Sequence, residues 1–350
     1  MRTEDFDYGL PPERIAQHPL AARDRARLLV DRGPSAPPEH RHVLDLPDLL
    51  EPGDLLVVND TRVLPARLRL RKPTGGAAEV LLLERDDEGD GWWEALVRPG
   101  RRLAPGARLV DGDGRDVAEV GDELGDGRRR VRLLVPGDKP STREAELALV
   151  DALGEMPLPP YITEVLDDPD RYQTVYARRP ASAAAPTAGL HLTEDLLARV
   201  AERGVEVVAV ELVVGLGTFR PIATDEVADH RMHGEAYRVA DDVWAACRSG
   251  RRVVAVGTTV VRALESAAAT GRLAGTTELF ISRGFRFQVV DRLLTNFHLP
   301  RSSLLVLIDA FVGPRWRDLY DVALADDYRF LSFGDAMLVD RADLDDEVAA

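Results

Sequence analysis

The sequence predicts an α/β fold: a mostly parallel sheet flanked by helices, with a small antiparallel β-barrel domain inserted near the N-terminus. Two observations carry this prediction. After about residue 154, helix-like and strand-like segments alternate, which is typical of βα units. Between residues 63 and 153, short strand-like runs follow one another with Gly- and Pro-rich turns between them. We therefore assign residues 1–62 and 154–350 to a discontinuous α/β domain and 63–153 to the inserted barrel.

The first strand of the α/β domain is expected at 55–58, an apolar run that polar turn residues bound, because the residues before it resemble loops and short turns. The barrel strands are each bounded by turn residues and are expected at 63–70, 79–84, 92–98, 108–110, 116–120 and 130–135.

The remaining elements follow from apolar periodicity and from the residues that end helices. Gly204 and Gly250 come directly after two helix-like segments, where glycine commonly ends a helix. Helices are expected at 143–153, 194–203, 241–248, 260–269 and 304–312. Strands are expected at 205–214, 252–256 and 279–282.

Composition limits the class of protein. The 350 residues are 45% hydrophobic and 30% charged, so the chain can bury a core and is not disordered throughout. The single cysteine, Cys247, excludes an intramolecular disulfide and a four-cysteine metal site. No apolar run of about 18 residues occurs and the N-terminus is acidic, so we expect a soluble cytoplasmic protein without a membrane span. The net charge of −15 excludes an overall basic footprint but leaves room for a local basic face.

Candidate sites are polar segments that follow strands, because ligands of open α/β sheets bind beyond the carboxyl ends of the strands. The segment APTAGLH (185–191) leads into a helix that Thr193 is placed to cap, so His191 would lie near a helix N-terminus. A capped turn with a surface histidine is the plainer alternative. In VVGLGTFRP (213–221), Gly215 and Gly217 would let a ligand approach bare backbone, although a tight structural turn explains them equally well.

The segment HRMHGE (230–235) holds two histidines and a carboxylate. His230, His233 and Glu235 have a spacing that suits zinc, an acid–base cluster or an unremarkable loop, and no cysteine or second histidine pair lies nearby to complete a tetrahedral site.

Two further segments lead into helices. In GTTVVRALES (257–266) the hydroxyls and backbone N–H groups at the helix start suit an anion, while Arg262 and Glu265 share one helix face and would stabilise it only slightly as an exposed pair. In TNFHLPRSS (295–303), Asn296 and His298 flank Phe297, an aromatic ring that either sandwiches a base or belongs to the core.

Taken together, nine segments in fixed order are far more specific than any one of them. From Phe6 to about Leu338 the chain resembles the S-adenosylmethionine:tRNA ribosyltransferase-isomerases of queuosine biosynthesis. The segments are NDTRVLPARL, MPLPPYI, YQTVYA, APTAGLH, GLGTFRPI, HRMHGE, GTTVVRALES, TNFHLPRSSLL and YRFLSFGDAML.

This resemblance implies an α/β domain interrupted by a small β-barrel, and it implies the reaction. The ribosyl part of S-adenosylmethionine is transferred and isomerised onto 7-aminomethyl-7-deazaguanine at the wobble position of a tRNA. The product is epoxyqueuosine, adenine and methionine leave, and no metal is implied. S-Adenosylmethionine is the ribosyl-donor substrate, tRNA is the partner, and we expect a monomer.

The chemistry implied by the resemblance needs a base and an acid. A sulfonium acidifies the adjacent C5′ protons, and adenine leaves more easily when its ring accepts a proton or a hydrogen bond. His191, His233 and His298 are the candidate catalytic groups, with Glu235 paired to a histidine or facing the sulfonium. Substrate contacts are expected from the matched motifs at Asn59, Thr61, Arg62, Pro186, Thr187, Gly189, Gly215, Gly217, Thr218, Thr258, Thr259, Arg262, Glu265 and Asn296.

The chain departs from the usual family pattern at several of these segments. Val213 stands where histidine is usual and Leu192 where phenylalanine is usual. Val260 and Asp309 each stand where the family usually has serine, and Ser282-Arg283 stands where it usually has Tyr-Pro. Asp60 stands where the family usually has the second asparagine of an Asn-Asn pair. These departures suggest two alternatives: a paralogue that uses S-adenosylmethionine on another acceptor, or a non-catalytic protein that binds tRNA or a metabolite.

A tRNA partner requires cations against phosphates. Arg128, Arg129 and Arg130 cluster in the predicted barrel, and Arg178 and Arg179 precede APTAGLH. We expect one of these clusters to face tRNA. The alternative is a solvated charge mixture balanced by neighbouring carboxylates.

Overall fold

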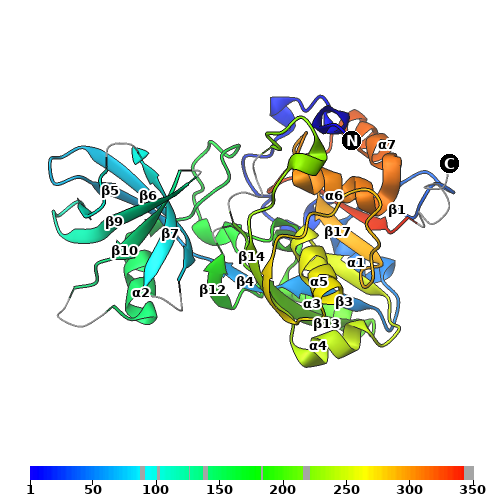
Figure 1. The fold of residues 1–350 in the computed structure, drawn as a ribbon. Coiled ribbons are helices and arrows are strands. Elements are labelled where there is room, and N and C mark those ends of the chain that lie inside the picture. Colours follow the sequence, from blue (N-terminus) through cyan, green and yellow to red (C-terminus); the bar gives the residue numbers. More distant parts are fainter. Residues whose placement is uncertain are drawn as a thin grey trace. The chain divides into compact units, whose positions relative to one another are not determined.

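The computed structural model describes residues 1–86, 91–100, 103–125, 127–136, 141–182, 184–215 and 221–342. The chain divides into two compact units. Figure 1 colours the ribbon by residue number, so the segments of each unit can be followed in it. Unit 1 contains 1–61, 160–179 and 185–350, and unit 2 contains 62–159 and 180–184. Each unit is described by itself.

Unit 1 is built on a sheet whose strand order, within the described residues, is β16-β14-β13-β3-β15-β17-β18-β1-β2. In chain order the strands are β1 (Arg27–Asp31), β2 (Glu39–His42), β3 (Leu55–Asn59), β13 (Glu206–Leu212), β14 (Glu235–Arg238), β15 (Val253–Val256), β16 (Ala274–Thr277), β17 (Arg292–Asn296) and β18 (Ala336–Asp340).

The sheet is mixed, which corrects the expectation of a mostly parallel one. Among the described strands, β13–β3, β3–β15, β15–β17 and β18–β1 are parallel pairs, and the four other neighbouring pairs are antiparallel. The physical reason is local. β1 and β2 form an N-terminal hairpin, β14 and β16 add antiparallel strands at the other edge, and β18 runs against β17. The parallel block β13-β3-β15-β17 nevertheless brings four carboxyl ends to one edge.

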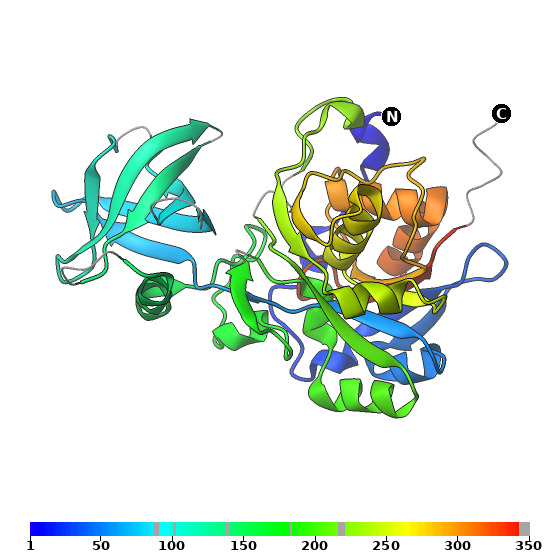
Figure 2. The ribbon, with the colours of Figure 1, turned by 60° about the horizontal axis from the view of Figure 1, so that its bottom comes forward.

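Helices cover both faces of this sheet (Figures 1 and 2). On one face, α1 (Leu46–Leu49) and α3 (Glu194–Glu202) pack against a core formed by alternate residues of β1, β3, β15 and β18, such as Leu56 and Val254. On the other, α5 (Thr258–Thr270) packs across β13, β3 and β15. The remaining helices of the unit are α4 (Asp241–Cys247), α6 (Ser303–Val312) and α7 (Trp316–Ala325).

Local signals explain where these helices begin. The side chain of Thr193 accepts a hydrogen bond from the Leu196 N–H at 3.1 Å and caps α3, and Ser302 caps α6 in the same way. Gly257 precedes α5 with φ = 91°, a backbone conformation that favours glycine.

Unit 2 contains a closed barrel. Its described strands are β5 (Arg67–Arg71), β6 (Ala77–Arg85), β7 (Trp92–Arg98), β8 (Ala107–Val110), β9 (Asp116–Gly125) and β10 (Arg128–Leu133). They pair antiparallel in the order β5-β6-β7-β10-β9-β8, and a β5–β8 pairing closes the barrel. β11 (Gly154–Glu155) extends the sheet, and β4 (Thr61–Val63) pairs with β12 (Arg179–Ser182) separately.

The helix α2 (Arg143–Leu153) is attached to this barrel by one buried carboxylate. Glu146 accepts hydrogen bonds from Arg85 Nε at 2.7 Å, Trp93 Nε1 at 2.9 Å and Ser141 Oγ at 2.8 Å. Because every contact is to unit 2, Glu146 holds the helix against the strands rather than serving a ligand.

Most helices and strands expected from the sequence are present, and three regions differ from the expectation. The expected strand at 279–282 is absent, because the strand lies earlier, at β16. The expected strand at 63–70 is divided into β4 and β5, since Pro65 lies between them. The N-terminal region, expected to contain only loops and turns, holds the strands β1 and β2. No helix in the described part of the chain is long and apolar enough to cross a membrane.

Candidate active site at the carboxyl edge of the sheet

The carboxyl ends of β13, β3, β15 and β17 define the candidate site. The chain leaves β3 for β13 on one side and later crosses to β15 on the other side, so the strand order reverses at β3. Open α/β sheets bind ligands at such a reversal. The segments that follow these strands are those that carry the sequence motifs.

A buried ion pair joins two of these segments. Glu235, at the start of β14, accepts a hydrogen bond from the Gly215 N–H at 3.1 Å, and its other oxygen pairs with Arg262 Nη1. Arg262 lies one turn into α5 and also donates from Nε to the Leu279 carbonyl at 3.2 Å. The pair fixes the loop after β13 to the helix after β15.

Two buried polar atoms near the start of α5 have no partner within the described residues. They are Oγ1 of Thr259 and Nη2 of Arg262. The first N–H groups of a helix also lack intrahelical acceptors. A hydroxyl, a guanidinium nitrogen and helix N–H groups together suit an anionic group such as a carboxylate.

Asn296, the last residue of β17, connects the APTAGLH segment to the sheet. Its Oδ1 accepts from Thr187 Oγ1 at 3.0 Å, and its Nδ2 donates to the Leu331 carbonyl at 3.2 Å and to His191 Nε2 at 3.0 Å. Because a carbonyl can only accept, this network assigns the amide orientation and makes His191 Nε2 an acceptor, with its ring proton on Nδ1.

Both buried histidines are neutral at physiological pH. Burial lowers the pKa of His191 to about 4, although a hydrogen bond with the backbone of Arg23 opposes the change. Burial lowers the pKa of His298 to about 3, and its Nε2 lies 3.0 Å from Thr295 Oγ1. The implied chemistry predicts a base and an acid that titrate near neutrality, and these two rings are less basic than that.

The surroundings of the two rings are small cavities. A cavity of about 20 Å³ is lined by His191 and Arg23, and one of about 30 Å³ is lined by Asn296, His298 and Thr187. Ser332 lines both. Each is large enough for a water molecule rather than a nucleoside, and the catalytic roles expected for the two rings stay predictions.

The remaining expected site residues are placed differently. Asn59 and Thr61 both hydrogen-bond the Leu212 carbonyl, which ties β3 to β13. Glu265 is fully buried and accepts from three backbone N–H groups at 288–290, which leaves it out of the site. His233 is exposed and, within the described residues, has no hydrogen bond to the other candidates.

Arg62 belongs to unit 2, where it lines a hollow beside α2. Pro186 is buried and directly precedes the 3₁₀ turn Thr187–His191. Gly217 and Thr218 lie outside the described residues. Within the described ranges, no group of three or more His, Cys, Asp or Glu side chains is arranged to hold a metal ion.

Most departures from the usual family pattern are accommodated by packing. Leu192 and Val260 are fully buried in the core, and Leu192 packs with Leu196 of α3 rather than lining a ligand site. Asp309 pairs with Arg283 at 2.6 Å and accepts from Trp316 Nε1 at 3.1 Å. Arg283 and Asp309, which both differ from the usual family residues, therefore neutralise each other's charge as an ion pair.

Two residues that the structure brings to this edge, Asp60 and Tyr176, are not among the predicted site residues. Asp60 follows β3 directly, and its Oδ1 is buried without a partner among the described residues. The Tyr176 hydroxyl is likewise buried and unpartnered. Asp60 lies in the motif NDTRV and Tyr176 in the motif YQTVYA. Membership of these matched motifs is therefore the sequence feature that could have identified both residues.

The structure contradicts one residue of the two arginine clusters, Arg129, and the others stay predicted tRNA contacts. Arg129 is buried and donates to the carbonyls of Gly100, Leu103 and Gly121 inside unit 2, so it does not face nucleic acid. Arg128 pairs with Glu94 at 2.9 Å, and Arg179 pairs with Glu211. Arg130 and Arg178 are exposed.

Gly189 is required by a close approach, and we expect Gly189→Ala to impair the site. A Cβ at this position would lie 1.9 Å from the Tyr176 hydroxyl oxygen, so the tyrosine would have to move. The activity that the sequence resemblance implies, release of adenine from S-adenosylmethionine, should fall at least tenfold while the melting temperature changes little. Gly9→Ala is the control, since no heavy atom lies within 4 Å of a Cβ there and its φ lies outside the left-handed region. Equal activity of the two variants would contradict the prediction.

Comparison with known proteins identifies relatives over nearly the whole chain. A family model described as "Queuosine biosynthesis protein" matches residues 3–339. A Moorella thermoacetica protein named S-adenosylmethionine:tRNA ribosyltransferase-isomerase is 52% identical over 350 residues, which cover 97% of this chain and 100% of that protein. A Symbiobacterium thermophilum protein of the same name is 50% identical, with the same coverage. A crystal structure of S-adenosylmethionine tRNA ribosyltransferase from Thermotoga maritima is 36% identical, covers 96% of this chain and 99% of that chain, and has a TM-score of 0.54.

Proposed function

The chain belongs to the S-adenosylmethionine:tRNA ribosyltransferase-isomerases of queuosine biosynthesis, and from that premise we propose that the carboxyl edge of β13, β3, β15 and β17 is where it binds S-adenosylmethionine. The enzyme transfers and isomerises the ribosyl part of S-adenosylmethionine onto 7-aminomethyl-7-deazaguanine at the tRNA wobble position, and it releases adenine and methionine. One observation supports this location of the binding site: buried polar atoms at this edge, among them Arg262 Nη2 and Thr259 Oγ1, have no hydrogen-bond partner within the described residues.

The chemistry of these atoms suggests which part of the substrate each one holds. Arg262 Nη2, Thr259 Oγ1 and the α5 N-terminus would take the methionine carboxylate, since together they offer positive charge and hydrogen-bond donors. Glu235 would orient Arg262 and, through the Gly215 N–H, the loop after β13. Thr187, Asn296 and His191 would position the APTAGLH backbone, including Gly189, against the substrate.

Adenine release tests the activity directly. The enzyme is incubated with S-adenosylmethionine and a tRNA that carries 7-aminomethyl-7-deazaguanine, and free adenine and methionine are measured. We expect release that requires this tRNA and equals the epoxyqueuosine formed. Release with an unrelated acceptor, or binding of S-adenosylmethionine without turnover, would instead support one of the two alternatives stated above.

We propose that tRNA contacts include the exposed outer face of β10, where Arg130 lies. Arg130→Glu should weaken tRNA binding and reduce the slope of log K against log salt by about 1, because one phosphate contact is lost. Arg108→Glu is the control: it makes the same charge change in unit 2, but Arg108 is already paired with Asp116 at 2.6 Å. Filter binding at several salt concentrations measures both, and identical behaviour of the two variants would contradict this surface.

We further propose that the enzyme acts as a monomer in the cytoplasm, where its tRNA substrate is found. Sedimentation of the enzyme with and without tRNA measures the oligomeric state. A stable dimer at working concentration would overturn this part of the proposal.

A further inference from the structure

The outer surface of the barrel in unit 2 carries an aromatic ring beside arginines. Residues of β10 alternate between the barrel interior and its surface, and Arg130 and Arg132 lie on the surface side. β7 pairs with β10 in a register that places Trp92 directly opposite Arg132. Trp92 is partly exposed, whereas its neighbour Trp93 is buried. The two strands therefore present an indole and cations on one surface.

Two neighbours hold the indole of Trp92 in place. The guanidinium carbon of Arg132 lies 4.4 Å from the centroid of the ring, which is a cation–π contact. A Cβ on Gly121 of β9 would lie 2.7 Å from Cζ3 and 3.1 Å from Cη2 of Trp92, so the indole occupies the space that a side chain at 121 would take. Because the ring is already positioned, a ligand that stacks on it need not immobilise it.

The charges on this surface favour an anionic partner. Arg130 is exposed, and neither its side chain nor that of Arg132 forms an ion pair with another described residue. The Glu94 carboxylate on β7 is already paired with Arg128 at 2.9 Å. Glu119 lies opposite Arg132 on β9. Two arginines that have no ion pair within the described ranges therefore outweigh this carboxylate, and the surface around the ring is net positive.

An exposed ring beside cations suits a nucleotide in a single-stranded segment. Aromatic rings and guanidinium planes stack on unstacked bases, and arginines pair with the phosphates that join those bases. A protein partner would instead call for a wider apolar patch than one indole provides. Residues 92–132 lie outside the nine motifs that the chain shares with its family, so a contact made here can belong to this chain without changing the shared chemistry.

We propose that Trp92 and Arg132 form a stacking platform for one unstacked base in a loop of the bound tRNA, an inference that rests on the proposed function. The base stacks on the exposed part of the indole–guanidinium pair, and Arg130 pairs with an adjoining phosphate. The platform binds and positions the tRNA and takes no part in breaking or forming bonds.

Trp92→Ala tests the platform through tRNA binding, measured by filter binding at several salt concentrations. The Kd for tRNA should rise by about 5–150-fold, the range expected when one base loses its aromatic partner. The slope of log K against log salt should stay that of the wild type, because the variant loses no charge. Trp92→Phe keeps a ring and should recover most of the affinity. Wild-type affinity of Trp92→Ala, or a slope reduced as in Arg130→Glu, would overturn the proposal.

Trp244→Ala is the matched control. Trp244 lies on α4 in unit 1, is also partly exposed, and has the Arg248 guanidinium carbon 5.8 Å from its ring centroid. Its removal should leave the Kd for tRNA unchanged, and equal weakening by the two alanine variants would contradict the platform. Fluorescence keeps the test open if Trp92→Ala fails to fold. Stacking on a base should quench the indole, so tRNA should quench the wild type more than Trp92→Phe, and equal quenching would contradict the contact.

Kinetics separate this inference from the proposed function. A platform that only binds should raise KM for the modified tRNA in Trp92→Ala and leave kcat for adenine release unchanged at saturating tRNA. A lower kcat with an unchanged KM would overturn it. If the wild-type enzyme releases no adenine with the modified tRNA, the proposed function is wrong. If the wild type does release adenine, and Trp92→Ala matches it in both KM and Kd, only the platform is wrong.

Discussion

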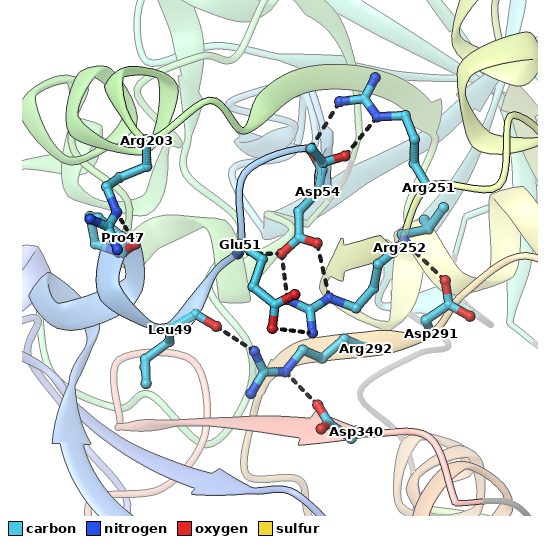
Figure 3. A network of polar contacts seen from close by, with 12 residues as sticks. Pro47, Leu49, Glu51, Asp54, Arg203, Arg251, Arg252, Asp291, Arg292 and Asp340 are labelled. Atoms are coloured by element: carbon cyan, nitrogen blue, oxygen red, sulfur yellow. Dashed lines mark hydrogen bonds and ion pairs between the residues drawn. The ribbon is translucent and has the colours of Figure 1, made fainter.

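Replacing Arg292 with alanine should lower the free energy of unfolding by about 3–5 kcal/mol, the range observed when one partner of a buried charge network is removed. Arg292 is the first residue of β17 and is fully buried. Nη1 of Arg292 donates a hydrogen bond to the Leu49 carbonyl at 2.7 Å (Figure 3). Nε lies 2.5 Å from Asp340 Oδ1, and the two form an ion pair whose angles do not meet the geometry of a hydrogen bond. Burial lowers the pKa of the guanidinium, because desolvation disfavours its charged form.

The effect follows from what the substitution leaves behind. The variant has a cavity at the amino end of the sheet, a Leu49 carbonyl without its donor, and an Asp340 carboxylate without its cation. Urea unfolding followed by far-UV circular dichroism measures the change. Arg203→Ala is the matched control from the same part of the fold (Figure 3), since Arg203 is half exposed, donates to the Pro47 carbonyl and forms only an exposed ion pair with Asp48 at 3.9 Å. It should cost less than about 1 kcal/mol. Equal losses in both variants would contradict the account.

Replacing Arg262 with methionine should abolish most activity and also destabilise the fold. Arg262 and Glu235 are each about 95% buried, so the substitution removes the cation from a buried carboxylate and should cost about 3–5 kcal/mol of stability. The lost contact to the substrate carboxylate should lower kcat/KM for adenine release about 100-fold, because a charged hydrogen bond contributes about 1.5–3 kcal/mol.

A double variant separates these two effects. Glu235→Gln combined with Arg262→Met removes both charges, so unfolding in urea should return to within about 1–2 kcal/mol of wild type. Binding of S-adenosylmethionine should stay weak, since the guanidinium is still absent. If the double variant recovers both stability and activity, Arg262 is purely structural and the proposed carboxylate contact is wrong.

Local sequence signals predicted much of the fold because they act within a few residues. Thr193 caps α3 whatever surrounds it, and the apolar run at 55–58 became β3 because any strand of that composition must be buried. The ordered motifs identified the family, and they placed Arg262, Glu235 and Asn296 in segments that the structure brings to one edge.

What a buried polar side chain does was decided only by tertiary structure, because hydrogen-bond partners come from distant parts of the chain. Glu265 looked like half of an exposed helix pair, yet it binds three backbone N–H groups more than twenty residues away. Arg129 looked like a phosphate contact, yet the barrel encloses it. Asp60 looked like part of a turn, and its unpartnered oxygen became visible only once β3, β13 and Tyr176 had been packed around it. Periodicity and capping are local and can be read along the chain, whereas desolvation and pairing depend on which residues the fold brings together.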